Sequence, residues 1–179
     1  MASGQGRRFG SNKLLADCHG EPMIARILDA TEGIFLQRVV VTRHEEIAHL
    51  CKDRDIPTVL HNLPNRNDTV RLGLEAMEGL DRCMFAPADQ PLLRYETVQA
   101  LALASKGSSQ LWRLSCEGVP GSPAVFPEWA FVELQNLPEG KGGGILLKKY
   151  PERLRTVRVR DESELRDVDR PEDLAELLE

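Results

Sequence analysis

The sequence is poor in the features that mark several large classes of protein. Aromatic residues make up only 5% of it, and its cysteines form no C-x-x-C pair. The four histidines also lack the spacing of metal ligands. We therefore expect free thiols rather than a disulfide framework or a zinc site. The cysteines concerned are Cys18, Cys51, Cys83 and Cys116.

Long apolar runs and an excess of positive charge are missing as well. No apolar stretch approaches bilayer length, and the amino end shows no hydrophobic region of the signal-peptide type, which predicts a cytoplasmic protein without membrane contact. The net charge of −5 argues against a general nucleic-acid-binding surface. A chain of 179 residues, 41% hydrophobic and 28% charged, predicts a single globular domain over residues 1–179.

Apolar clusters of strand and helix character alternate along the chain. Strands are predicted at 38–42, 57–61 and 83–86, and helices at 22–31, 43–53, 68–77 and 96–104. The spacing of Thr42 and Glu45 indicates a capping box at the second helix. This alternation predicts an α/β fold with a mainly parallel sheet covered on both faces. In such sheets ligands bind beyond the carboxyl ends of the strands.

The amino end carries the strongest chemical signal. Residues 1–13 read M-A-S-G-Q-G-R-R-F-G-S-N-K, in which glycines allow backbone N–H groups to converge on an anion while Arg8 and Lys13 add positive charge. The glycine spacing is one residue too long for the dinucleotide fingerprint, and no P-loop sequence follows. The segment predicts a phosphate cradle, with a basic surface turn as the alternative.

Two acidic segments are candidates for binding a metal. In F-A-P-A-D-Q-P-L, Asp89 directly follows a predicted strand, and D-V-D-R-P-E-D-L begins at Asp167 and leads from a strand into the last helix. Carboxylate oxygens suit Mg²⁺, which leaves its other positions to water and phosphate. If the chain is extended, Asp167 and Asp169 point to opposite sides, so only one of them reaches the metal. For Asp89 the alternative is a turn cap.

These segments resemble nucleotidyltransferases of the molybdenum cofactor and sugar-nucleotide type. Residues 1–13 are similar to that family's opening L-A-A-G-x-S-x-R-M-G-x-x-K, with Gly6 in place of a serine, and D-Q-P-L and D-x-D-x-P-E-D-L resemble its later motifs. The resemblance implies a three-layer, Rossmann-like nucleotidyltransferase fold. In that family a buried strand precedes the loop, so either the native chain starts upstream of Met1 or the sheet lacks its first strand.

Two further segments bear on the substrates. R-N-D-T-V-R-L-G-L from Arg66 is similar to R-x-D-S-V-x-x-G-L of isoprenoid cytidylyltransferases, which favours cytosine as the base; a simple helix cap is the alternative. The stretches 121–126 and 139–147 resemble the G-N-P-V-L-F and G-D-x-G-x-x-x-L-L motifs of cofactor cytidylyltransferases. Lys141 and Gly144 depart from those motifs, which leaves the acceptor open.

The resemblance implies a Mg²⁺-dependent transfer of CMP from CTP to the phosphate of molybdopterin, with release of pyrophosphate. GTP in place of CTP, and a transient contact with the molybdoenzyme that receives the product, are further expectations. A cytidylyl- or guanylyltransferase acting on a sugar or polyol phosphate and a non-catalytic nucleotide-binding or cofactor-binding protein remain alternatives. The implied site residues are catalytic Arg8 and Lys13; nucleotide-binding Ala2, Ser3, Gly4, Gly6, Arg8, Gly10, Lys13, Arg66, Asp68 and Thr69; and metal-binding Asp89 with Asp167, Asp169 being the reserve.

Overall fold

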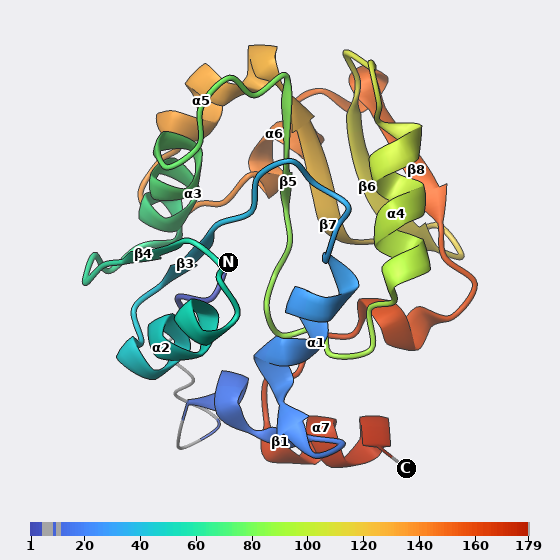
Figure 1. Cartoon of the computed structure of the whole chain (residues 1–179). Helices are drawn as coiled ribbons and strands as arrows, with labels where there is room; N and C mark the ends of the chain where they lie inside the picture. Colours follow the sequence, from blue (N-terminus) through green and yellow to red (C-terminus); the bar gives the residue numbers. More distant parts are fainter. Residues whose placement is uncertain (5–8, 10–11, 179) are drawn as a thin grey trace.

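A computed structural model describes residues 1–4, 9 and 12–178, and it has an α/β fold with strands between two layers of helices (Figure 1). Two parallel strands stand beside a four-stranded mixed sheet of order β5-β7-β6-β8. β7 is antiparallel to both of its neighbours, whereas β6 and β8 are parallel. The strands are β1 (Asp17–Cys18), β2 (Glu21–Pro22), β3 (Val40–Thr42), β4 (Thr58–Leu60), β5 (Arg82–Phe85), β6 (Leu111–Cys116), β7 (Val119–Pro127) and β8 (Leu154–Arg158).

The helices connect these strands and pack on both faces. In Figure 1, α1 and α4 lie in front of the sheet and α6 lies behind it. The α-helices are α1 (Met23–Ala30), α2 (Glu45–Asp53), α3 (Arg66–Glu75), α4 (Tyr95–Ala104), α5 (Phe131–Gln135), α6 (Gly144–Lys149) and α7 (Pro171–Leu178). Short 3₁₀ helices are η1 (Lys13–Leu15), η2 (Glu128–Ala130), η3 (Pro151–Arg153) and η4 (Glu162–Leu165).

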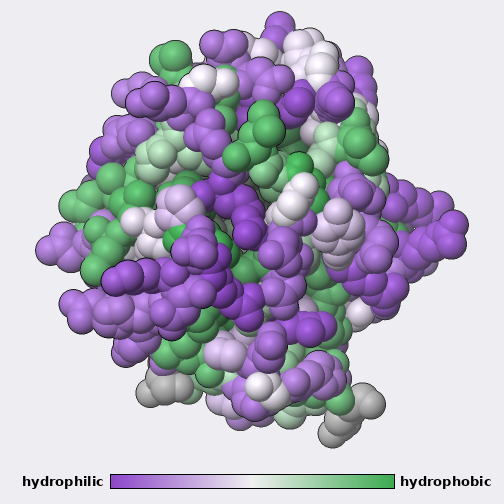
Figure 2. All heavy atoms as spheres, in the orientation of Figure 1, coloured by the Kyte–Doolittle hydropathy of each residue, from purple (hydrophilic) through white to green (hydrophobic). Residues whose placement is uncertain are grey.

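Successive side chains of β7 point to opposite faces of the sheet, and each face packs against its own hydrophobic core. Val125 belongs to the core that also receives side chains of α1, α2, α4 and α7, and its neighbours Ala124 and Phe126 point into the core of α3, α5 and α6. This arrangement is the three-layer architecture expected from the sequence. Figure 2 shows that the outer surface on the viewed face is mostly hydrophilic, with smaller hydrophobic areas between.

Helix starts differ from the sequence predictions by a few residues, for identifiable reasons. α3 begins at Arg66 rather than 68 because Asn65 is its N-cap. α2 begins at Glu45 rather than 43, and the capping box predicted at Thr42 is wrong because Thr42 belongs to β3. Its hydroxyl accepts the His44 N–H at 3.2 Å and donates to the Ala2 carbonyl at 2.9 Å.

Five strands and one connection were not recognised in the sequence; the strands are β1, β2, β6, β7 and β8. β6, β7 and β8 supply most of the larger sheet, so the sheet contains more antiparallel pairing than the alternating pattern suggests. The segment before Asp167 is the 3₁₀ helix η4 rather than a strand. No helix in the described residues is long and apolar enough to cross a bilayer. The four cysteines are buried and free, as expected.

Candidate active site

Lys13 is the centre of a polar cluster that ties the amino end to two distant segments. It is the first residue of η1, whose N-cap is Asn12. Its ammonium nitrogen Nζ donates to Asp89 Oδ2 at 2.7 Å, to the Val168 carbonyl at 2.6 Å and to Asp169 Oδ1 at 3.3 Å. Lys13 is 8% exposed, so these oxygens replace most of the water around its charge.

The two acidic segments also meet through the backbone. The Val168 N–H donates to the Asp89 carbonyl at 2.8 Å, just beyond the carboxyl end of β5. The Gln90 side chain, 2% exposed, donates to Asp167 Oδ1 at 2.9 Å and to the Leu165 carbonyl at 3.1 Å. Asp167 and Asp169 thus turn to different partners, which agrees with their alternation in the sequence. Burial and the negative charge of Asp89 raise the pKa of Asp167.

A histidine fixes Ser3 at the beginning of the glycine-rich segment. Ser3 Oγ donates to the Val41 carbonyl at 3.1 Å and lies 2.8 Å from His61 Nε2. Because His61 Nδ1 accepts the Leu63 N–H at 3.2 Å, Nε2 carries the proton and donates to Ser3 Oγ. Ser3 is therefore held by the ends of both β3 and β4.

Its neighbours are held from the same side. The Gly4 carbonyl lies 2.9 Å from His44 Nε2, and the Ala2 N–H donates to the Val41 carbonyl at 2.9 Å. In the sequence, His44 and His61 stand out only by their lack of metal-ligand spacing, so their contacts with Gly4 and Ser3 were not predicted. The signal that would have found them is their place directly beyond β3 and β4, at the edge where α/β proteins gather ligand-binding groups.

The start of α3, expected to contact the base, lies against the second glycine-rich stretch. The Gly140 N–H donates to Asn67 Oδ1 at 2.9 Å. A Cβ at Gly142 would come within 2.8 Å of Arg66 Cδ, so this close approach depends on glycine. The stretch 139–147, which resembles an acceptor loop, therefore lies next to the start of α3, which resembles a base-binding segment.

Asp68 and Thr69 have structural roles at this helix start. Asp68 Oδ2 accepts the Asn65 N–H at 3.1 Å and completes a capping box. Thr69 is 3% exposed and lines an internal groove. Arg66, at the first position of α3, is exposed to solvent.

The sequence-predicted site residues thus fall into three groups. The structure brings Lys13, Asp89 and Asp169 together, with Asp167 beside them, and it places Ala2, Ser3 and Gly4 beyond β3. Arg66, Asp68 and Thr69 form the start of α3. The predicted residues that lie outside the described part of the chain are Gly6, Arg8 and Gly10.

The donors around Lys13 are of the kind that a hard divalent cation takes. Asp89 and Asp169 offer carboxylate oxygens on either side of the same ammonium group. Within residues 1–4, 9 and 12–178, no three His, Cys, Asp or Glu side chains form a ready metal-binding group. Mg²⁺ is commonly held by one or two carboxylates together with water and substrate phosphates, so two aspartates suffice.

The cation and the carboxylates gather beyond the carboxyl end of β5, at the edge of the sheet where α/β proteins commonly bind ligands. Residues 1–155 match the family model described as MobA-like NTP transferase domain, and the chain belongs to this family. It is a nucleotidyltransferase. The comparison with curated proteins finds no significant match.

Solved structures support the fold. Rv0371c from Mycobacterium tuberculosis H37Rv is 20% identical, with a TM-score of 0.87 over 99% of this chain and 94% of that one; a second structure of it is a complex with manganese. A nucleotidyl transferase from Methanothermobacter thermautotrophicus is 22% identical, with a TM-score of 0.84 and coverage of 98% and 92%. Molybdopterin-guanine dinucleotide biosynthesis protein A from Archaeoglobus fulgidus is 22% identical, with a TM-score of 0.68 and coverage of 98% and 93%.

The anchoring of Ser3 predicts a pH-dependent stability. Burial, with the nearby charge of Arg43, lowers the pKa of His61 below its ordinary value of 6.5, while Asp68 opposes the shift. The unfolded chain therefore takes up this proton at higher pH than the folded protein, so stability falls as the pH drops below about 6.5. We expect the melting temperature to fall less between pH 7.5 and 5.0 in His61→Gln than in the wild type.

The glutamine keeps an N–H donor for Ser3 but does not titrate, so the comparison isolates the proton on His61. His49, which is exposed on α2, provides a matched control as His49→Gln, and this substitution should leave the pH profile unchanged. Parallel pH profiles for wild type and His61→Gln would contradict a lowered pKa of His61 in the folded protein.

Proposed function

We propose that this chain transfers CMP from CTP to the terminal phosphate of a molybdopterin-type cofactor and releases pyrophosphate. The single observation that carries the proposal is the convergence of Lys13, Asp89 and Asp169 at the end of β5, beside the glycine-rich segment. The family assignment supports the nucleotidyl transfer, and the motif likenesses at 66–74 and 89–92 support cytosine and the cofactor.

The reaction requires alignment and charge compensation more than covalent chemistry. An oxygen of the acceptor phosphate forms a bond to the α-phosphorus of the nucleotide, and the bond to the β-phosphate oxygen breaks, so that pyrophosphate leaves with the electron pair. The Lys13 ammonium is suited to offset the negative charge that grows on the leaving group. We assign the backbone of residues 2–4 to positioning the nucleotide, held by His44 and His61.

The same residues suggest how the free protein avoids an unpaired charge. Without substrate, Lys13 is compensated by two carboxylates and a carbonyl. A triphosphate competes for the ammonium group, and Asp89 and Asp169 are then available to a divalent cation. When bound, Mg²⁺ would neutralise phosphate charge, and a manganese complex of Rv0371c supports the use of divalent metals in such structures.

The proposal extends to the base, the domain organisation, the location and a protein partner. The base is assigned to Arg66 and the start of α3, where Asp68 and Thr69 shape the helix rather than face solvent. We propose that residues 1–179 act as one domain, because one of the two cores draws side chains from Ala2 to Leu174 and β7 contributes side chains to both. We also propose a cytoplasmic location and a transient contact with a molybdoenzyme, which follow from the cofactor.

Replacing Lys13 should abolish most of the turnover. Lys13→Met retains the buried stem and removes the cation, so we expect kcat to fall by roughly 10²- to 10³-fold, by analogy with losing one preorganised electrostatic donor. The measurement is pyrophosphate release under saturating nucleotide, with circular dichroism to verify folding. Lys52→Met, on the exposed side of α2, is the matched control and should retain full turnover. Near-normal turnover of Lys13→Met would refute the role.

The metal assignment can be tested by comparing two neighbouring aspartates. Asp169 contacts Lys13 together with Asp89, whereas Asp167 is held by Gln90, so we propose Asp89 and Asp169 as the metal ligands. In titrations of Mn²⁺ with a non-reactive CTP analogue, we expect Asp169→Asn to weaken metal binding about tenfold or more, and Asp167→Asn to weaken it less. The reverse order would move the metal to Asp167.

The substrates are tested by nucleotide and acceptor preference. Isothermal titration with Mg²⁺ should show tighter binding of CTP than of GTP, by about tenfold or more. Pyrophosphate release should then require molybdopterin and be absent with sugar and polyol phosphates. Preference for GTP would assign the chain to guanylyl transfer, and release with a sugar phosphate would replace the acceptor. Binding of CTP with no release for any acceptor would indicate a non-catalytic nucleotide-binding protein.

A further inference from the structure

Gln90 is a buried amide whose hydrogen-bonding capacity is only partly used. Gln90 is 2% exposed, and its Nε2 donates to Asp167 Oδ1 at 2.9 Å and to the Leu165 carbonyl at 3.1 Å. The Oε1 of the same amide is buried and has no hydrogen-bond partner in the part of the chain that the structure describes. Burying an unsatisfied polar oxygen is unfavourable, so packing alone does not account for a glutamine at this position.

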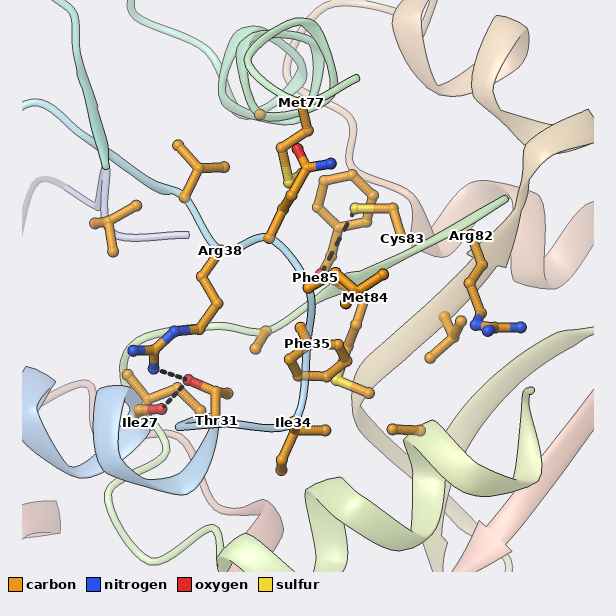
Figure 3. Close-up of a pocket in the computed structure, with 18 of the residues that line it drawn as sticks. Ile27, Thr31, Ile34, Phe35, Arg38, Met77, Arg82, Cys83, Met84 and Phe85 are labelled. Carbon is orange, nitrogen blue, oxygen red and sulfur yellow. Dashed lines mark hydrogen bonds between the residues drawn. The ribbon is translucent and has the colours of Figure 1, made fainter. Parts of the chain in front are cut away.

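An apolar cavity lies along β5 but does not reach this amide. The cavity has a volume of about 620 Å³, and Figure 3 shows Met84 and Phe85 of β5 among the side chains around it. Its lining includes Ala88, from the segment that follows β5, but neither Gln90 nor Asp167. Gln90 therefore faces the closing acidic segment of the chain and not this cavity.

The closing acidic segment is attached to the end of β5 independently of Gln90. The Val168 N–H donates to the Asp89 carbonyl at 2.8 Å, and the Val168 carbonyl accepts from Lys13 Nζ at 2.6 Å. The Val168 side chain is fully buried in the core. Because these contacts fix the backbone here, what Gln90 adds at this point is its bond to the carboxylate of Asp167.

Asp167 lies within the electrostatic range of the polar cluster around Lys13. Burial and then the negative charge of Asp89 raise the pKa of Asp167, while the Gln90 hydrogen bond and the charge of Lys13 act in the opposite direction. A carboxylate that interacts with both of these charges is also within range of a cation bound beside them. Without a donor of its own, it would be drawn toward Lys13 or toward the metal.

We propose that Gln90 is a positioning residue that decides which of the two closing aspartates takes part in metal binding. Its Nε2 holds Asp167 Oδ1, and Asp169 is left to face Asp89 across an ammonium group. This role rests on the proposed function, in which Asp169 rather than Asp167 binds the metal. An amide suits the task because it donates to a carboxylate without adding a charge that would compete for phosphate.

The consequence is a metal site with two carboxylates instead of three. Mg²⁺ held by one or two carboxylates keeps its other positions for water and phosphate oxygens. A third carboxylate would take one of these positions and would repel the negative charge of the triphosphate. By holding Asp167, Gln90 favours phosphate binding as well as the choice of ligand.

The test asks whether removing the amide brings Asp167 into the metal site. Gln90→Met keeps a side chain of similar volume and removes the donor. The probe is the Mn²⁺ complex of inorganic tripolyphosphate, titrated calorimetrically, which contains neither base nor acceptor. In the wild-type background, Asp169→Asn should weaken its binding more than Asp167→Asn does. In Gln90→Met, the loss of affinity caused by Asp167→Asn should be about fivefold or more larger than in the wild-type background, a coupling typical of side chains in direct contact.

Gln110 provides the matched control. It lies just before β6, at the opposite edge of the sheet, and its Oε1 is likewise buried without a partner among the described residues. Gln110→Met should leave the effects of both aspartate substitutions unchanged. A general loosening of the fold by Gln90→Met would lower the melting temperature and weaken binding without changing the relative effects of the two aspartates, and that result would overturn the proposal.

Failure of this role and failure of the metal assignment give different results. If Asp169→Asn has the larger effect by the same ratio in both backgrounds, the metal assignment stands and the role of Gln90 is wrong. If Asp167→Asn has the larger effect in the wild-type background, the metal assignment is wrong, and the proposal for Gln90 is overturned with it because Gln90 then holds a ligand. Gln90→Leu, which is also apolar, gives the same comparison if Gln90→Met does not fold.

Discussion

The ion pair between Lys13 and Asp89 is the interaction on which the geometry of the site depends. A lysine that is 8% exposed must find oxygen partners within the protein, and the sequence supplies them from segments 76 and 156 residues away. The Val168 carbonyl at 2.6 Å and the Val168 N–H to the Asp89 carbonyl complete the junction. The amino end, the end of β5 and the entry to α7 are therefore held in one place by charge compensation and backbone hydrogen bonding.

This compensation is also what makes the cluster suitable for a charged ligand. A buried ion pair contributes little net stability, because desolvation offsets most of its attraction. In the proposed function, a triphosphate that replaces the carboxylates around Lys13 would therefore break an ion-pair cluster that contributes little net stability. The released carboxylates would then attract a cation, so phosphate binding and metal binding would favour one another. Asp167 has a different partner, because its Oδ1 accepts from the Gln90 side chain at 2.9 Å.

Sequence patterns predicted the elements whose signals are local, and they missed those that depend on distant pairing. Asp89 could be placed beyond the carboxyl end of β5 because it lies four residues after Phe85, the last residue of that strand. β7 escaped recognition because Pro120, Gly121 and Pro123 argue against a strand, and only its pairing with β5 and β6 makes it one. The contact between Lys13 and Asp169 spans 156 residues, and no spacing rule reveals it. The hydrogen bond between Gln90 and Asp167, which underlies our proposal of Asp169 rather than Asp167 as a metal ligand, likewise joins distant segments and has no local signal.

The amino end of the chain lies between β3 and the segment that follows β5. Ala2 forms a parallel bridge with Thr42 of β3, and on the other side the Met1 nitrogen donates to the Ala86 carbonyl at 2.8 Å. The ends of β3 and β4 hold Ser3 and Gly4 through Val41, His44 and His61. The residues that we propose to position the nucleotide are therefore fixed by strands from both parts of the sheet, whereas Lys13 is fixed by the carboxylates and the carbonyl around it.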